Sequence, residues 1–245
     1  FTEGENSITR AIKINRNYAK AYYSLSTLKN LKDNNLLTSY IFSDINLNSL
    51  NNIDKINIYF ARSNYLHRAR EFKESALNLK LANDIKLKIF PSDVDDIIKK
   101  SKELNYESNK LNLNINKNKN EIKYIFIVGM FRSGSTLAES IISMNKNVYS
   151  LGESNIFLLA YNEWKKIRSS NKGIELEDLY SKHINKLRPG ARFTTNKFLY
   201  NYQFAGIISK HLNSARIIHC FRNPLDNILS IYRTHFAVGS TYASS

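Results

Sequence analysis

The segment 124–139, with the sequence YIFIVGMFRSGSTLAE, constrains the fold more than any other part of the chain. It begins with an apolar run rich in β-branched and aromatic residues, which is typical of a strand covered on both faces. A loop bounded by Gly129 and Gly134 follows, and glycines allow an anion to approach the backbone closely. Ser135 and Thr136 then open a helix, whose free N–H groups and dipole favour a phosphate or sulfate. The segment therefore predicts an anion-binding loop.

This loop differs from the nucleoside-triphosphate P-loop, G-x-x-x-x-G-K-[ST], at one position. The two glycines have the P-loop spacing, but Ser135 stands where the P-loop has the lysine that reaches the β- and γ-phosphates. The cation lies inside the loop instead, as Arg132. Triphosphate chemistry is therefore disfavoured, although a nucleotide kinase or another P-loop phosphotransferase stays an alternative. A further alternative is an ordinary strand–turn–helix corner.

The run GMFRSGSTL closely resembles the 5′-phosphosulfate loop of sulfotransferases, which use 3′-phosphoadenosine-5′-phosphosulfate (PAPS) as sulfuryl donor. Sulfotransferases usually have Pro before the loop Arg, whereas this chain has Phe131, and we expect some loss of rigidity there. The resemblance implies that five consecutive residues contact the donor: Arg132, Ser133, Gly134, Ser135 and Thr136.

PAPS has a second anionic group, its 3′-phosphate, and a matching motif follows later in the chain. The segment 216–232 resembles the sulfotransferase 3′-phosphate motif, in which an Arg ends a strand and a Ser follows eight positions later. Arg222 and Ser230 have this spacing. An Arg can clamp a phosphate with two hydrogen bonds, and a hydroxyl adds a neutral donor. We expect Asp226 to be a structural residue in the first turn of a helix.

Two short motifs suggest catalytic residues, and both resemble sulfotransferases related to the tyrosylprotein enzymes. A Gly-Glu pair ends at Glu153, and its glutamate is taken to deprotonate the acceptor hydroxyl. An Asn-Lys pair ends at Lys197, near the transferring group. The resemblance implies in-line attack of an acceptor oxygen on sulfur, with 3′,5′-ADP as leaving group. Arg132 and Lys197 would stabilise the developing charge, and no metal is required.

Several readings stay open at this point. Glu153 can instead be a solvated or helix-capping residue, and Lys197 a plain surface lysine. The family has Pro where Leu199 stands, while Asn201 matches an Asn frequent in bacterial members that carry tetratricopeptide repeats. Phe131 and Leu199 give some weight to a further alternative, a non-catalytic scaffold whose helical repeats bind a partner and whose α/β domain is degenerate. The acceptor is open among a protein tyrosine, a carbohydrate hydroxyl and a small alcohol.

Strands and helices are expected to alternate after residue 121. We expect strands at 124–128, 191–195 and 215–220, the first and the last of them buried. We expect helices at 136–143, 155–168, 175–187, 202–211 and 224–236. This order implies a parallel sheet with helices on both faces, a P-loop-type three-layer α/β fold. Residues 121–245 would then form the first half of a sulfotransferase domain. Ligands bind beyond the carboxyl ends of such strands, where Arg132, Lys197 and Arg222 fall.

Residues 1–93 have helical periodicity and resemble the tail of a tetratricopeptide array, with an unspecific helical domain as the alternative. Small and bulky residues recur where such repeats pack their helices, and this favours a platform for a protein partner or a dimer. These residues are Gly4, Ile8, Ala11, Tyr22, Leu25, Ser26, Ser63, Leu66, Phe72, Ser75, Leu79 and Ala82. Residues 94–120 are expected to hold one more helix and then, from 105, a solvated linker.

Composition limits the remaining classes. The net charge of +15 comes from Lys and Arg spread along the chain, so we expect attraction of anionic ligands rather than nucleic-acid binding. The lone Cys220 excludes an internal disulfide and offers no metal cluster. No stretch approaches the roughly 20 apolar residues of a membrane span, and no signal peptide is visible, so we expect a cytoplasmic protein. The domain pattern stops at Ser245, and we expect little or no activity from these residues alone.

Overall fold

The computed structural model describes residues 2–28, 35–91, 93–110, 122–168 and 173–236. The chain divides into two compact units. The helical unit consists of Phe1–Val94 and Leu229–Ser245, and the sheet unit is Asp95–Ile228. Among the described residues, 229–236 therefore group with the helical residues. The domain bounds 1–93, 94–120 and 121–245 stay predictions.

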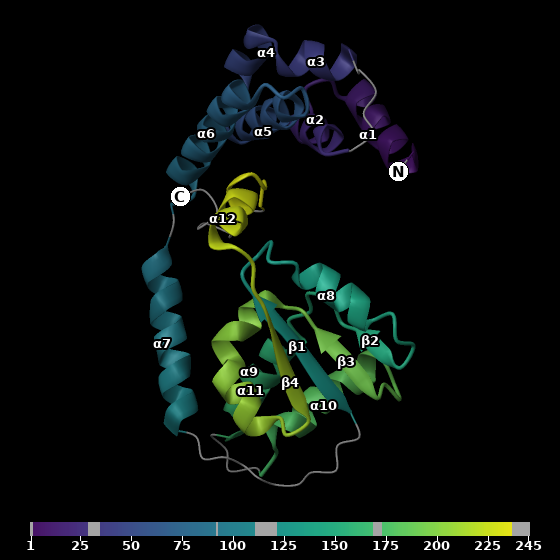
Figure 1. Cartoon of the computed structure of the whole chain (residues 1–245), viewed down its shortest axis with the longest axis vertical. Coiled ribbons are helices and arrows are strands. Elements are labelled where there is room, and N and C mark those ends of the chain that lie inside the picture. Colours follow the sequence, from purple (N-terminus) through teal and green to yellow (C-terminus); the bar gives the residue numbers. More distant parts are fainter. Residues whose placement is uncertain (1, 29–34, 92, 111–121, 169–172, 237–245) are drawn as a thin grey trace. The chain divides into compact units, whose positions relative to one another are not determined.

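Among the residues that the structure describes, four parallel strands form the centre of the sheet unit (Figure 1). Their spatial order is β2-β3-β1-β4, with β1 between two neighbours. The strands are β1 (Lys123–Gly129), β2 (Val148–Ser150), β3 (Phe193–Asn196) and β4 (Ala215–Cys220). The expected parallel sheet is confirmed, and β2 is an addition, because the sequence pattern indicated no strand there.

Helices precede, connect and follow these strands. They are α7 (Val94–Lys110), α8 (Ser135–Ile142), α9 (Ile156–Arg168), α10 (Leu176–Leu187), the 3₁₀-helix η1 (Leu199–Phe204), α11 (Ala205–His211) and α12 (Pro224–Tyr232). Because crossovers between parallel strands are right-handed, α8 lies on one face and α9–α11 on the other. Tyr124 and Phe126 of β1 pack against Tyr180 and Phe157 of the second set, and Phe157 in turn meets Phe204 of η1. This is a mixed α/β arrangement of three layers.

Three expectations about these elements need correction. β4 is not buried: it pairs with β1 alone among the described strands, and Ile217 and Ile218 are 37% and 38% exposed. The helix at 202–211 begins as the 3₁₀-helix η1. Residues 105–110 are helical rather than a linker, because α7 buries Leu104 in the core of the sheet unit and buries Ser108 nearby.

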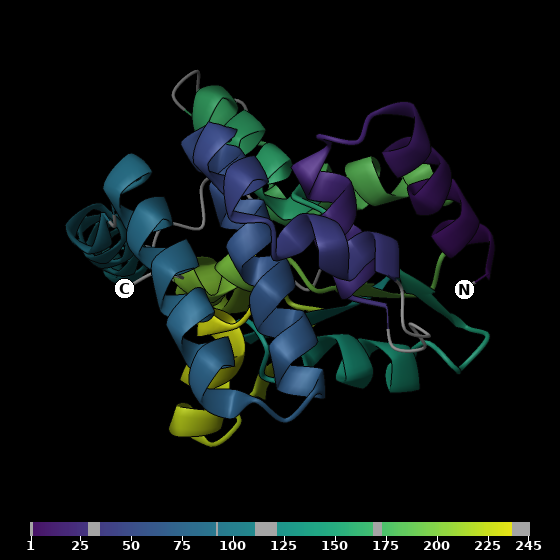
Figure 2. The same cartoon turned by 90° about the horizontal axis from the view of Figure 1, so that it is seen from above.

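The helical unit contains α1 (Thr2–Ile14), α2 (Ala19–Ser26), α3 (Asn35–Ile41), α4 (Asp44–Ser49), α5 (Asn52–Arg68) and α6 (Phe72–Ile89). The last two lie side by side, blue in Figures 1 and 2. They approach closely because small residues face each other: the Oγ atoms of Ser63 and Ser75 are 3.1 Å apart and buried. A helical region is confirmed, and its assignment to tetratricopeptide repeats stays a prediction.

The segment 229–236 packs within the helical unit. The ring of His235 stacks on Phe60 at 4.7 Å between centroids and meets the ring of Tyr23 edge-on at 5.0 Å. Asn83 Nδ2 donates to the carbonyl of Tyr232 at 3.1 Å. Helix α12 was expected to reach residue 236 but ends at Tyr232. Just beyond that end, the Thr234 hydroxyl donates to the backbone carbonyl of Ser230 and so competes with continued helix.

Acidification is expected to destabilise the helical unit through His235. Burial, aided by the ammonium groups of Lys86 and Lys20, lowers the pKa of His235 from 6.5 to about 4. The unfolded chain therefore binds this proton first. The contribution of neutral His235 to the free energy of unfolding is complete above the unfolded pKa. It is lost between about pH 6.5 and pH 4, by up to about 3 kcal/mol. Urea unfolding across this range should show the loss. His235→Phe keeps the stacking and should flatten the dependence, and an unchanged slope in that variant would exclude His235 as its source.

Candidate active site

The loop between β1 and α8 has the backbone that the two glycines allow. Gly129 has φ +147°, and a Cβ there would lie 2.4 Å from the carbonyl oxygen of Cys220, its partner on β4. Gly134 has φ +95° and is the N-cap residue of α8. Arg132 also has a positive φ, +68°, which is uncommon for a residue with a side chain. The surrounding structure must hold this conformation.

Two contacts anchor the loop at the position where sulfotransferases have Pro. Asn227 Nδ2 donates to the carbonyl of Phe131 at 2.6 Å. The ring of Phe131 meets the ring of Tyr200 edge-on, with centroids 5.6 Å apart. On the next residue, the carbonyl of Arg132 accepts a 3.4 Å hydrogen bond from Arg222 Nη1. The loop is thus held by side chains from the segments that follow β3 and β4.

The polar groups of the loop fit an oxyanion. Ser133 is 9% exposed, and its Oγ has no hydrogen-bond partner among the described residues. An unsatisfied buried hydroxyl costs about 1–3 kcal/mol, so a ligand oxygen there would stabilise the loop. The N–H groups of the first turn of α8 lack acceptors within the helix and carry the positive end of its dipole. A phosphate or sulfate group would satisfy both.

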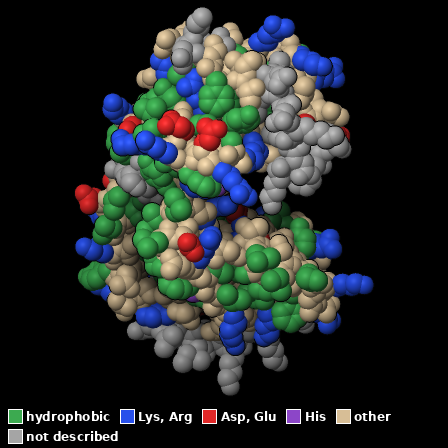
Figure 3. Space-filling view, turned by 45° about the horizontal axis from the view of Figure 1, so that its top comes forward, with side chains coloured by type: hydrophobic (Ala, Val, Ile, Leu, Met, Phe, Trp, Pro, Cys, Tyr) green, Lys and Arg blue, Asp and Glu red, His purple; other side chains and the backbone are tan. Residues whose placement is uncertain are grey.

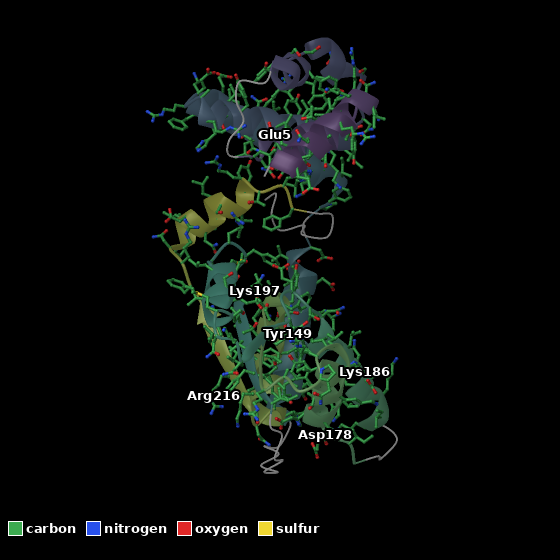
Figure 4. All side chains as sticks on the ribbon, turned by 90° about the vertical axis from the view of Figure 1, so that its right-hand side faces the viewer. Glu5, Tyr149, Asp178, Lys186, Lys197 and Arg216 are labelled. Carbon is green, nitrogen blue, oxygen red and sulfur yellow. The ribbon has the colours of Figure 1, made fainter. Side chains whose placement is uncertain are left out.

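The structure brings Glu153 and Lys197 together. Lys197 Nζ lies 2.5 Å from Glu153 Oε1, and the Lys197 N–H donates to the carbonyl of Gly152 at 2.8 Å. The side chain of Lys197 is 5% exposed, whereas that of Glu153 is 66% exposed. Each residue follows a strand, so the pair lies at the carboxyl edge of the sheet. Arg216 is near the start of β4. Figure 4 shows Lys197 at the opposite end of the sheet from this arginine.

Arg222 follows β4, and its Nη2 lies 3.9 Å from the Asp226 carboxylate in the first turn of α12. Asn223 Oδ1 accepts hydrogen bonds from two N–H groups of that turn. Ser230 lies further along the same helix, and its carbonyl accepts a hydrogen bond from Thr234 Oγ1. The roles of Arg222 and Ser230 toward a ligand stay predictions.

Two buried polar residues of this region were missed in the sequence. Asn227 is 6% exposed and holds the loop between β1 and α8 through the carbonyl of Phe131. Glu139 is also 6% exposed and accepts hydrogen bonds from Ser150 and Thr195. A signal existed for Glu139, because it is one turn after Ser135 and places a charge on a helix that is otherwise mostly apolar. No comparable signal distinguishes Asn227.

Other surface features lie away from this edge. A pocket of about 500 Å³ lies along α10, and one of about 400 Å³ near the start of β2 and β3.

Within the described ranges, no group of three or more His, Cys, Asp or Glu residues can hold a metal ion. None of the helices described there is long and apolar enough to cross a bilayer. Lys and Arg side chains are spread over the face seen in Figure 3.

Comparison with known proteins points to one family. Residues 162–245 match the model of the sulfotransferase family, a stretch that includes Lys197, Arg222 and Ser230. An uncharacterized protein of Aquifex aeolicus is 28% identical over 130 residues, covering 46% of this chain. The matched region is 17% of the length of that relative. No solved structure matches the chain significantly. The family match supports a transferase of the sulfotransferase class.

Proposed function

We propose that this chain binds PAPS and transfers its sulfuryl group to an acceptor hydroxyl. The observation that carries the proposal is the ion pair between Lys197 and Glu153, which joins a buried cation and an accessible carboxylate at the carboxyl edge of the sheet. This is the edge where ligands bind in such folds, and the anion-binding loop opens there. The family match over residues 162–245 supports the same class of reaction.

The donor would bind through two groups of residues that start from neighbouring strands. Gly129 and Cys220 are paired at the ends of β1 and β4, so the two segments leave the sheet side by side. The 5′-phosphosulfate contacts would come from Arg132, Ser133, Gly134, Ser135 and Thr136. The 3′-phosphate contacts would come from Arg222 and Ser230. The hydrogen bond from Arg222 to the carbonyl of Arg132 supports this proximity.

The proposed reaction is an in-line displacement at sulfur. The acceptor oxygen forms a bond to sulfur while the bond from sulfur to the bridging oxygen breaks, and 3′,5′-ADP leaves. Glu153 accepts the proton of the hydroxyl, a role that its exposure permits. Lys197, Arg132 and the loop N–H groups stabilise the charge on the sulfuryl and bridging oxygens. Because the side chain of Lys197 is buried, its ammonium needs little reorganisation.

The acceptor class rests on resemblance alone. Protein tyrosine is the first class to test, and the helical unit would then offer a surface for a protein substrate. Carbohydrate hydroxyls and small alcohols are the other arms of the same screen, run with labelled PAPS on this chain and on any longer natural form. Turnover of ATP in place of PAPS would favour a phosphotransferase instead.

Nucleotide binding tests the donor site directly. We expect the chain to bind 3′,5′-ADP more tightly than 5′-AMP in calorimetry, because only the former has the 3′-phosphate. Arg222→Ala should lower the affinity for 3′,5′-ADP about ten- to a hundredfold and leave 5′-AMP unchanged, since a hydrogen bond to a charged group contributes about 1.5–3 kcal/mol. Arg216→Ala, an exposed arginine at the amino end of β4, is the matched control. Equal affinity of the unaltered chain for both nucleotides would contradict the proposal.

A further inference from the structure

Glu139 is a buried carboxylate that the proposed reaction does not use. It lies in α8 with 6% exposure. Its Oε1 accepts two hydrogen bonds, from Ser150 Oγ at 2.9 Å and from Thr195 Oγ1 at 2.8 Å. A buried carboxylate is costly unless it is hydrogen-bonded, and bonds to an ionised acceptor are roughly twice as strong as neutral ones. Hydrogen bonds to Glu139 therefore tie both donors, Ser150 and Thr195, to α8.

The two donors are the last residue of β2 and the next-to-last residue of β3. Ser150 and Thr195 are register partners, so their side chains emerge on the same face of the sheet. This is the face that α8 covers. Glu139 lies one helical turn after Ser135, which opens α8 at the end of the anion-binding loop. One carboxylate oxygen thus joins the loop's helix to two strand ends.

Hydrogen bonds continue from these strand ends toward the ion pair. Ser150 Oγ also accepts from the N–H of Gly152 at 3.3 Å, the residue before Glu153. The N–H of Leu151 donates to the carbonyl of Thr195 at 2.9 Å. The Lys197 N–H in turn donates to the carbonyl of Gly152 at 2.8 Å. The backbones that carry Glu153 and Lys197 are therefore linked to Glu139.

We propose that Glu139 is a positioning residue that fixes the Glu153–Lys197 pair relative to the anion-binding loop. The inference rests on the proposed function and deepens it. In-line transfer needs the base, the cation and the donor in one geometry, and a misplacement of about 1 Å can cost about a hundredfold in rate. A carboxylate suits this position because it only accepts hydrogen bonds, and both neighbours are hydroxyl donors.

Three substitutions test the inference. In a form of the protein that transfers sulfuryl groups, Glu139→Ala should lower kcat about ten- to a hundredfold. The Kd for 3′,5′-ADP should be unchanged, because the loop remains intact. Glu139→Gln keeps an Oε1 acceptor and should restore part of kcat. The double variant Thr195→Val with Glu139→Ala should raise the activation free energy by less than the sum of the two single variants, because both remove the same hydrogen bond.

Hydrogen exchange gives a readout that does not depend on turnover. In Glu139→Ala, amides of the segments 148–154 and 193–198 should exchange faster, while those of β4 do not change. Glu177→Ala is the matched control: Glu177 is a carboxylate 1% exposed, and it accepts N–H groups of Asn213 and Ser214 beside the amino end of β4. Its loss should reduce stability without changing kcat per folded molecule.

Two outcomes would overturn the inference. One is unchanged exchange in both segments. The other is a fall in transfer by Glu139→Ala that only matches the loss of folded protein, as for a purely structural residue. The proposed function fails by a different observation: an unaltered chain that neither transfers sulfuryl groups nor prefers 3′,5′-ADP to 5′-AMP. In that case the exchange experiment still decides whether Glu139 positions the two strand ends.

Discussion

Lys197→Ala is expected to lower the rate of sulfuryl transfer about a hundred- to a thousandfold, as loss of a preorganised donor to a transition-state oxyanion does. The ammonium is held at the carboxyl edge of the sheet, 2.5 Å from Glu153 Oε1, with its side chain almost fully buried. The Kd for 3′,5′-ADP should change little, because that nucleotide lacks the sulfuryl group. Single-turnover transfer of labelled sulfate from PAPS by a form of the protein that is active, beside calorimetry with 3′,5′-ADP, separates the two quantities.

Lys165→Ala is the matched control for this variant. Lys165 on α9 also pairs with a glutamate, Glu107 at 3.2 Å, but is 52% exposed and lies outside the candidate site. Glu153→Gln should also slow transfer, and the double variant with Lys197→Ala should lose less than the two single losses combined, since the residues act as a pair. Transfer at the normal rate by Lys197→Ala would exclude this lysine from the mechanism.

The central strand and the loop could be predicted because their signals are local. An apolar run ending in a glycine-bounded loop dictates β1, the turn and the start of α8 without any distant contact. The same holds for the order of strands and helices, which indicates a parallel sheet. The same rule places Arg132, Lys197 and Arg222 at one edge, because they follow predicted parallel strands. The meeting of Glu153 with Lys197 was not predicted, because it depends on β2. Only the resemblance to sulfotransferases gave these residues chemical roles.

Other features depend on contacts that the local sequence does not contain. An apolar pair such as Ile217 and Ile218 fits an edge strand as well as a central one. The sequence therefore did not predict that β4 is exposed. The three residues of β2 form a strand because they pair with β3, and the run is too short to show a period. The stacking of His235 on Phe60 joins residues far apart in the chain, and no pattern in either segment predicts it.

Gly129→Ala is expected to destabilise the sheet unit by about 3–5 kcal/mol, through backbone strain and overpacking together. At φ +147° the backbone lies in a region that is essentially restricted to glycine. The new Cβ would lie 2.4 Å from the carbonyl oxygen of Cys220. That oxygen belongs to the backbone of the paired strand β4, so it can move only if the pairing of β1 and β4 opens. Urea unfolding of the variant measures the loss.

Gly134→Ala separates the two causes. Gly134 also has a positive φ, +95°, but nothing lies within 4 Å of a Cβ built on it. Strain alone should then cost about 1–2 kcal/mol. Binding of 3′,5′-ADP should be lost in Gly129→Ala, because opening the strand pair separates the loop from Arg222. A loss no larger than that of Gly134→Ala would mean that β4 yields to the new methyl group. The close pairing of β1 and β4 would then not be what holds the two segments proposed to bind PAPS together.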